Sequence, residues 1–237
     1  MWDIVARPLH ASIIGSKWVF DVKLHPNGSL GRFKTRVVAQ GFKQEFEIDY
    51  EETFAPVAKM QTVKTLFVVA ALRGWCLKKL DVKNAFLHGD LKKTIYMECP
   101  PGYLGGDKSK VCLLHRFFYG LKHTTRAWFE KFQDTILLAG FTHSDNDPSL
   151  FVQRIDRGIT ILLIYVDDML ISGYNVGRIQ ELTATLHATF HLKELGDVSY
   201  FLGLEVQLGE AFGRFGSNRI EIMYTGFPSS IKSQTEL

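Results

Sequence analysis

The chain has 237 residues with a formal net charge of +3, and 46% of the residues are hydrophobic. This composition predicts a globular, soluble protein with a sizeable core, in one large domain or two small ones. The three scattered cysteines and the lack of a signal-peptide pattern favour an intracellular setting without disulfides, and do not separate a cytoplasmic particle from the nucleus. The apolar stretch around residue 161 is shorter than the roughly 20 residues a bilayer needs, so no membrane partner is expected.

The first predicted elements are two strands, residues 17–24 and 31–39, on either side of a turn at 25–29. Between residues 16 and 44 there are six basic side chains and one acidic side chain, Asp21. A basic hairpin of this kind suits a phosphate-bearing partner, with a solvated strand face as the alternative. The basic residues are Lys17, Lys23, Arg32, Lys34, Arg36 and Lys43.

Helices and strands then mix without strict alternation. Apolar residues at helical spacing predict helices over residues 61–72, 125–138 and 175–190. Strands are predicted over 76–82, 94–98, 159–165, 169–171 and 200–206. This order favours an α+β fold with an antiparallel sheet over a doubly wound fold.

Two adjacent carboxylates, Asp167 and Asp168, interrupt the apolar run from Leu163 to Ser172. Residues 166–168 suit a tight hairpin turn, and carboxylates beside buried strands are disfavoured unless a cation lies against them. A hard divalent cation such as magnesium takes oxygen ligands of this type. Asp81, at the end of the 76–82 strand, adds a third carboxylate, for which a turn or helix-cap role is the alternative.

Four segments in one order carry a family resemblance. They are Leu-Asp-Val-Lys-Asn-Ala-Phe-Leu-His-Gly-Asp-Leu at 80–91, Tyr-Gly-Leu-Lys at 119–122 with Arg-Ala-Trp at 126–128, Val-Asp-Asp at 166–168, and Tyr-Phe-Leu-Gly-Leu-Glu-Val at 200–206. Together they resemble the reverse transcriptase of copia-type LTR retrotransposons. Further similarity in segments 15–20, 32–41 and 48–57 extends the resemblance over residues 1–206.

The resemblance implies a right-hand polymerase with an antiparallel palm sheet backed by helices. Residues 1–75 would be mainly fingers and 76–206 mainly palm, with the two interleaved. Residues 207–237 form a divergent tail that we expect to be poorly ordered. The thumb and ribonuclease H regions of a full-length polyprotein are absent from this sequence.

The resemblance also implies roles for individual residues. Asp81, Asp167 and, less directly, Asp168 match the carboxylates that hold two magnesium ions, for which manganese can substitute. The nucleotide-binding positions are Lys34, Arg36, Phe86, Tyr119 and Gly120, with Phe86 as a steric gate against the ribose 2′-hydroxyl. The primer-grip positions are Phe201, Leu202 and Gly203. The implied partners are an RNA or DNA template with its primer and deoxynucleoside triphosphates.

Simpler roles compete with these assignments. Phe86 as core packing, Arg36 as a solvent-facing strand residue and Tyr119 as an ordinary buried aromatic remain alternatives. The family usually continues Gln, a small residue and Pro after position 122, where this chain has His123, Thr124 and Thr125. The sequence therefore leaves two alternatives open. The chain is an RNA-directed DNA polymerase domain, or it is a decayed retrotransposon fragment with weak or no nucleic-acid binding and no catalysis.

Overall fold

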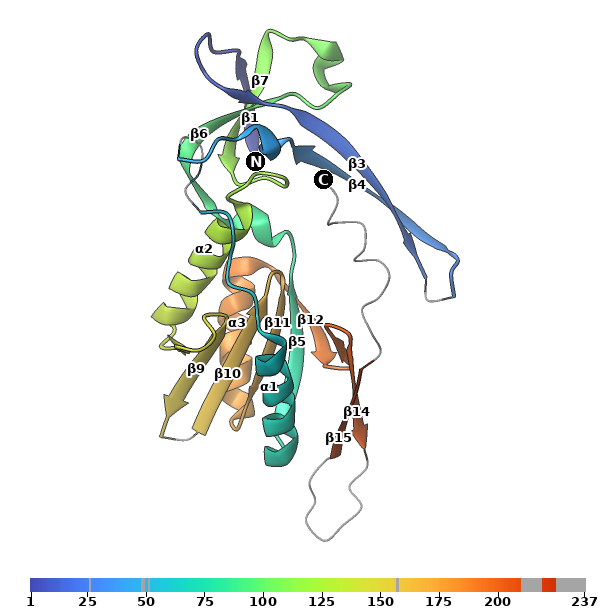
Figure 1. The fold of residues 1–237 in the computed structure, drawn as a ribbon, viewed down its shortest axis with the longest axis vertical. Coiled ribbons are helices and arrows are strands. Elements are labelled where there is room, and N and C mark those ends of the chain that lie inside the picture. The colour runs from blue at the N-terminus through green and yellow to red at the C-terminus, as the bar shows by residue number, and fades with distance from the viewer. Residues whose placement is uncertain (26, 48–49, 51, 157, 210–218, 225–237) are drawn as a thin grey trace. The chain divides into compact units, whose positions relative to one another are not determined.

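The computed structural model describes residues 1–25, 27–47, 50, 52–156, 158–209 and 219–224. The chain forms two compact units, one from residues 1–55 and 84–134 and the other from residues 56–83 and 135–237 (Figure 1). The chain therefore passes between the units three times, after residues 55, 83 and 134. The family resemblance predicts one main boundary, at residue 75, with the two regions interleaved. Whether the two units correspond to fingers and palm stays a prediction.

The first unit holds a four-stranded sheet in the order β1-β7-β6-β2 and a separate hairpin, β3–β4. Its core gathers Met97 and Cys112 from the sheet with Phe117, Phe118 and Leu121 from the segment that follows it. The strands are β1 (Trp2–Ala6), β2 (Ile13–Ile14), β3 (Ser16–Leu24), β4 (Leu30–Ala39), β6 (Asp90–Glu98) and β7 (Lys110–Arg116). Three short 3₁₀ helices complete it: η1 (Gly41–Lys43), η2 (Ala85–His88) and η3 (Tyr103–Gly106).

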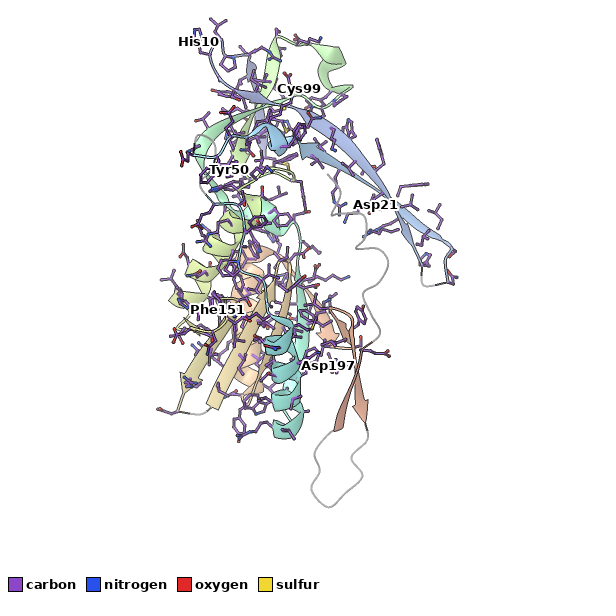
Figure 2. The ribbon with its side chains drawn as sticks, in the orientation of Figure 1. His10, Asp21, Tyr50, Cys99, Phe151 and Asp197 are labelled. Carbon is purple, nitrogen blue, oxygen red and sulfur yellow. The ribbon has the colours of Figure 1, made fainter. Side chains whose placement is uncertain are left out.

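The β3–β4 hairpin has two chemically different faces. Directly opposed residues share a face, so the pairing of Val22 with Phe33 forms an apolar face, on which Phe20 and Phe33 are each 75% exposed. Asp21, which is labelled in Figure 2, opposes Lys34 on the other face, and Lys23 opposes Arg32 there. The predicted basic hairpin is confirmed, and its cations lie on one face of the ribbon.

The second unit is built on a six-stranded sheet in the order β12-β5-β11-β10-β9-β8, with every neighbouring pair antiparallel. The two central strands over residues 158–165 and 168–173 are mostly apolar, as is typical of strands that are buried on both faces. The strands are β5 (Cys76–Val82), β8 (Thr142–His143), β9 (Leu150–Ile155), β10 (Gly158–Tyr165), β11 (Asp168–Gly173) and β12 (Leu192–Asp197). The predicted α+β class with an antiparallel sheet agrees with this arrangement.

Helix α1 (Met60–Arg73) lies in front of the sheet in Figure 1, and α3 (Val176–Phe190) lies behind it. Phe67 of α1 packs in one core cluster with Leu163 and Leu170 of the sheet. Gly74 ends α1 with φ at 62°, a left-handed conformation that glycine adopts without strain. Asn175 caps α3 by accepting a hydrogen bond from the Arg178 N–H at 3.1 Å. The third predicted helix is α2 (Thr124–Leu138).

The single strand predicted over residues 200–206 is wrong in detail. The segment forms two strands, β13 (Tyr200–Phe201) and β14 (Leu204–Gly209), because Leu202 and Gly203 take positive φ values of 49° and 81° and turn the chain. A further strand, β15 (Arg219–Tyr224), pairs with β14 inside the segment expected to be poorly ordered. Residues 210–218 and 225–237 lie outside the described part of the chain.

Candidate active site

The β10–β11 hairpin places Asp167 at its tip and Asp168 at the start of a strand. Tyr165 and Asp168 form the last opposed pair, so Val166 and Asp167 make a two-residue turn rather than the predicted three-residue turn. Val166 has φ of 58°, which is the left-handed conformation that tight hairpin turns require. Strand pairing up to Asp168 therefore fixes both carboxylates at one end of the sheet.

Asp81 on β5 lies directly opposite Asp168 on β11. Because directly opposed residues share a face, these two side chains lie on the same face of the sheet. The backbone N–H of Val82 donates to the Asp167 carbonyl oxygen at 2.9 Å, which ties the hairpin tip to β5. Strand pairing thus gathers three carboxylates at one end of the sheet, although Asp167 and Asp168 lie 86 and 87 positions after Asp81 in the sequence.

The surroundings at this end of the sheet disfavour the charged form of the Asp167 carboxyl. Loss of hydration raises the pKa of the Asp167 carboxyl, and the neighbouring charges of Asp168 and Asp81 raise it further. Lys79 opposes the rise, and its Nζ lies 3.0 Å from an Asp168 carboxylate oxygen. The Lys79 and Asp168 side chains are 19% and 30% exposed, so water screens this pair only in part.

The donor chemistry suits a hard divalent cation, which takes carboxylate oxygens and relieves repulsion among them. Within the described ranges, no three His, Cys, Asp or Glu side chains are grouped closely enough to hold a metal ion. Asp168 is oriented towards the Lys79 ammonium. Asp81 and Asp167 are therefore the better candidates for direct ligands.

Three of the predicted nucleotide-binding residues contact one another in the first unit. The Arg36 guanidinium lies 5.9 Å from the Tyr119 ring centroid, and the Tyr119 and Phe86 rings meet edge to face at 5.4 Å. All three are half-buried, so each keeps some surface toward solvent. This combination offers a guanidinium and two ring edges to a ligand.

Gly120 and Lys34 have different surroundings. Gly120 has φ of 89°, and a Cβ there would overlap the carbonyl oxygen of Ala39, so glycine is required by packing alone. Partial burial lowers the pKa of Lys34, and the charges of Arg36, Lys23 and Arg32 lower it further. With Lys17, five cations lie on this hairpin face, which favours an anionic partner.

The predicted primer-grip residues lie in the turn between β13 and β14. Phe201 is fully buried and packs edge to face on Phe67 and Tyr165, with centroid distances of 6.5 and 6.4 Å. Leu202 and Gly203 form the turn itself. Through Tyr165, the residue before the β10–β11 turn, Phe201 touches the hairpin that carries Asp167 and Asp168.

Comparison with known proteins identifies the family. A family model described as reverse transcriptase (RNA-dependent DNA polymerase) matches residues 1–222. The chain belongs to this reverse transcriptase family. The match also corrects the prediction that the resemblance ends at residue 206, since it continues through most of β15.

Several relatives of this reverse transcriptase chain are Pol polyproteins of transposons. The retrovirus-related Pol polyprotein from transposon RE1 of Arabidopsis thaliana is 40% identical over 208 residues, covering 87% of this chain and 14% of that protein. The one from transposon TNT 1-94 of Nicotiana tabacum is 39% identical over 207 residues, covering 86% of this chain and 16% of its own length. These matches confirm the copia-type resemblance, and the chain spans only a small part of each relative.

A solved structure of telomerase from Candida albicans, in complex with a fragment of telomeric RNA, is also similar to the chain. It shares 12% sequence identity with a TM-score of 0.41, and the match covers 86% of this chain and 46% of the telomerase chain. None of the helices in the described ranges is both long and apolar enough to cross a membrane.

The structure accommodates the departure from the family pattern at residues 123–125. Helix α2 begins at Thr124, whose hydroxyl donates to the Phe118 carbonyl oxygen at 2.9 Å. The Thr125 hydroxyl donates to the Thr53 carbonyl oxygen at 2.8 Å. The His123 ring stacks on Phe117 with an interplanar angle of 14°. These three side chains hold the helix start without a proline.

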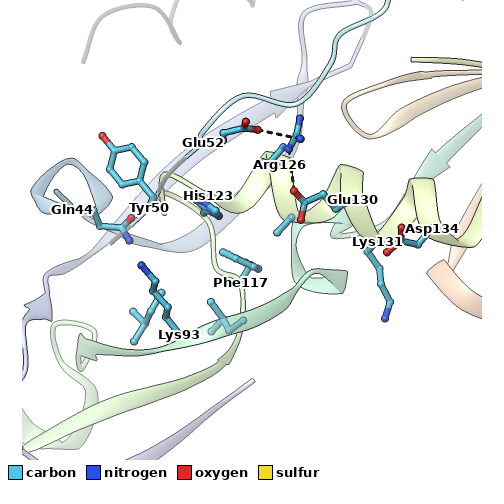
Figure 3. Close-up of a pocket in the computed structure, with 13 residues that line it drawn as sticks. Gln44, Tyr50, Glu52, Lys93, Phe117, His123, Arg126, Glu130, Lys131 and Asp134 are labelled. Carbon is cyan, nitrogen blue, oxygen red and sulfur yellow. Dashed lines mark hydrogen bonds and ion pairs between the residues drawn. The ribbon is translucent and has the colours of Figure 1, made fainter. Parts of the chain in front are cut away.

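His123 also borders a cavity of about 680 Å³ within the first unit (Figure 3). Arg126 lies at its edge and pairs with Glu52 and Glu130, each at 3.1 Å. The three carboxylates do not line this cavity. Its mixed charges identify no ligand, so we assign it no role in the chemistry.

Lys79 is the site residue that sequence reasoning missed. A signal was present, since a lysine in a mostly buried strand two residues before Asp81 lies on the same face as that carboxylate. The cross-strand register that brings Lys79 diagonally to Asp168 was needed to interpret it.

Proposed function

We propose that this chain is part of an RNA-directed DNA polymerase and adds deoxynucleotides to a primer by two-metal phosphoryl transfer. The observation that carries the proposal is the opposed pair Asp81 and Asp168, with Asp167 at the adjoining hairpin tip. Membership of the reverse transcriptase family supports the same reaction. The template with its primer and the deoxynucleoside triphosphates are the proposed partners.

The carboxylates hold the catalytic cations in this proposal. Asp81, Asp167 and, less directly, Asp168 are the proposed ligands for magnesium, or for manganese in its place. The bound cations supply activation of the primer 3′-hydroxyl and neutralisation of the pyrophosphate leaving group. The chain itself contributes positioning and charge, which are the main terms in phosphoryl transfer.

The first unit supplies groups that bind the incoming nucleotide. Arg36 donates its forked N–H groups to the triphosphate, and Lys34 adds a positive charge. Phe86, braced by Tyr119, excludes a ribose 2′-hydroxyl. The turn at Leu202 and Gly203 holds the primer end.

Primer extension on an RNA template, with magnesium and with manganese, tests this function. We expect deoxynucleotide addition that requires a divalent cation and that falls steeply with added salt, because phosphate contacts supply most of the affinity. A folded chain that binds primer–template yet adds no nucleotide with either metal would support the decayed-fragment alternative.

Replacing Phe86 by Val tests the proposed gate. Loss of the ring opens space beside the sugar, so the ratio of ribonucleotide to deoxyribonucleotide addition should rise at least about tenfold, in the range that pocket contacts supply. Competition between the two nucleotides in single-turnover extension measures this ratio. Phe33→Val, on the exposed hairpin face, is the matched control, and an equal ratio in both active variants returns Phe86 to core packing.

A further inference from the structure

The carboxylate site contains its own cation. Lys79 and Asp168 lie on neighbouring strands, where Lys79 opposes Leu170 and is diagonal to Asp168 on the same face. Diagonal neighbours on a sheet are within reach of long side chains, and here Nζ comes within 3.0 Å of the carboxylate. The lysine therefore reaches along the sheet to the acid that strand pairing places beside Asp81.

A second contact fixes the position of the ammonium. Lys79 Nζ lies 5.4 Å from the centroid of the Phe201 ring, which is fully buried between Phe67 and Tyr165. A cation over an aromatic face is attracted to it, most strongly where water is partly excluded. The lysine thus bridges the carboxylate hairpin and the β13–β14 turn. An exposed surface lysine has no comparable restraint.

Two neighbouring lysines differ from Lys79 in exposure or in the face of the sheet on which they lie. Lys193 on β12 opposes Asp81 in register but is exposed, so water screens its charge. Lys78 points to the opposite face of β5, because successive side chains of a strand alternate. Lys79, by contrast, lies on the same face as Asp81 and Asp168, forms an ion pair with Asp168 and is partly buried.

We propose that Lys79 is the built-in counter-ion of Asp168 and removes it from the metal-ligand set, so that Asp81 and Asp167 bind the divalent cation. The proposal rests on the proposed function and narrows its site from three carboxylates to two. Because the ammonium occupies the Asp168 carboxylate, that acid acts as a positioning residue that holds Lys79 between the hairpin and Phe201.

Lys79→Met keeps the aliphatic stem and removes the charge, which frees Asp168 beside the site. We expect Mn²⁺ affinity, measured by electron paramagnetic resonance titration of free Mn²⁺, to rise about tenfold, since one charge at contact distance is worth at least this much to a divalent ion. Lys78→Met, with the same change of net charge on the opposite face, should shift affinity less than about threefold. Equal shifts in these two variants would overturn the proposal.

The double variant Lys79→Met, Asp168→Asn removes the pair as a unit and restores the net charge of the site. Its Mn²⁺ affinity should stay within about threefold of the unmodified chain if Asp168 is not a ligand. A loss of tenfold or more would show that Asp168 binds the ion. Thermal melts of each variant without metal confirm folding, and Lys79→Gln serves in place of Lys79→Met if that variant does not fold.

Asp81→Asn and Asp167→Asn separate this inference from the function on which it rests. If both weaken Mn²⁺ binding while Lys79→Met behaves like Lys78→Met, the Lys79 assignment alone is wrong. If neither weakens Mn²⁺ binding, the ion binds elsewhere and the proposed polymerase site itself fails. Weakening by both, with the tenfold gain in Lys79→Met, supports both conclusions.

Discussion

Replacing Asp81 or Asp167 by Asn should lower metal-dependent primer extension by at least about 10³-fold, the scale on which loss of a directed electrostatic contact to a transition state is felt. Each change keeps the shape of the side chain and removes a negative charge from the end of the sheet where the three acids gather. Single-turnover extension at saturating nucleotide measures the chemical step apart from binding.

Asp197→Asn is the control for these substitutions. Asp197 belongs to the same sheet, on the edge strand β12, and is exposed. Its loss should change the rate less than about threefold, because a screened surface charge contributes little. If all three variants extend primers at the rate of the unmodified chain, the carboxylates at this end of the sheet do not carry the chemistry.

Replacing Asp147 by Ala should reduce the free energy of unfolding by about 3 kcal/mol, because the donors around this buried carboxylate lose a charged acceptor. Asp147 is 2% exposed and lies in the loop between β8 and β9. It accepts hydrogen bonds from the Lys59 N–H at 3.1 Å and the Thr62 hydroxyl at 2.6 Å, and from Ser149. Lys59 is the N-cap of α1 and makes no side-chain cap, and the Asp147 carboxylate binds the start of the helix through the Lys59 backbone N–H and the Thr62 hydroxyl.

Chemical denaturation of Asp147→Ala at neutral pH measures this loss. Asp145→Ala, an exposed position in the same loop, should stay within about 0.5 kcal/mol of the unmodified chain. A loss of similar size in both variants would mean that the loop as a whole, and not the Asp147 carboxylate, stabilises the start of α1.

The pH dependence of this contribution has a definite sign. Burial alone would raise the pKa of Asp147, but the hydrogen bonds from Ser149, Thr62 and the Lys59 N–H lower it below the ordinary value of 3.8. The stabilisation is therefore fully present above about pH 4 and is lost as the pH falls through the lowered folded-state pKa. The difference in stability between the unmodified chain and Asp147→Asn should shrink below pH 4, as denaturation at pH 3 and pH 6 would show.

Much of the second unit was predictable from local sequence. The helix over 61–72 and the strand over 76–82 follow from apolar spacing with a terminal glycine or acid, and both are confirmed within a residue at each end. Strands β1, β2, β7, β8, β9 and β12 were missed. For β1, β2 and β12 the pairing partners lie far away in sequence, and β8 has only two residues. The turn within 200–206 was missed because Leu202, unlike glycine, gives no sequence signal for a positive φ.

The site was predictable as a set of residues and not as an arrangement. Two adjacent acids in an apolar hairpin indicate charges that need a nearby cation. The register that places Asp81 opposite Asp168, however, is a property of strand pairing across the sheet. The same register brings Lys79 to Asp168. Residue types alone therefore gave no sign that Asp168 pairs with Lys79.

The threading of the chain between its two units has a consequence for synthesis on the ribosome. Strand β5 ends at Val82, and its partner β11 ends at Gly173, about 90 residues later. At a synthesis rate of roughly 5–20 residues per second, β5 is therefore complete about 5–18 s before β11. We expect the apolar residues of β5 to stay exposed during this interval, and a nascent chain with such exposed residues is prone to aggregate and to need chaperones.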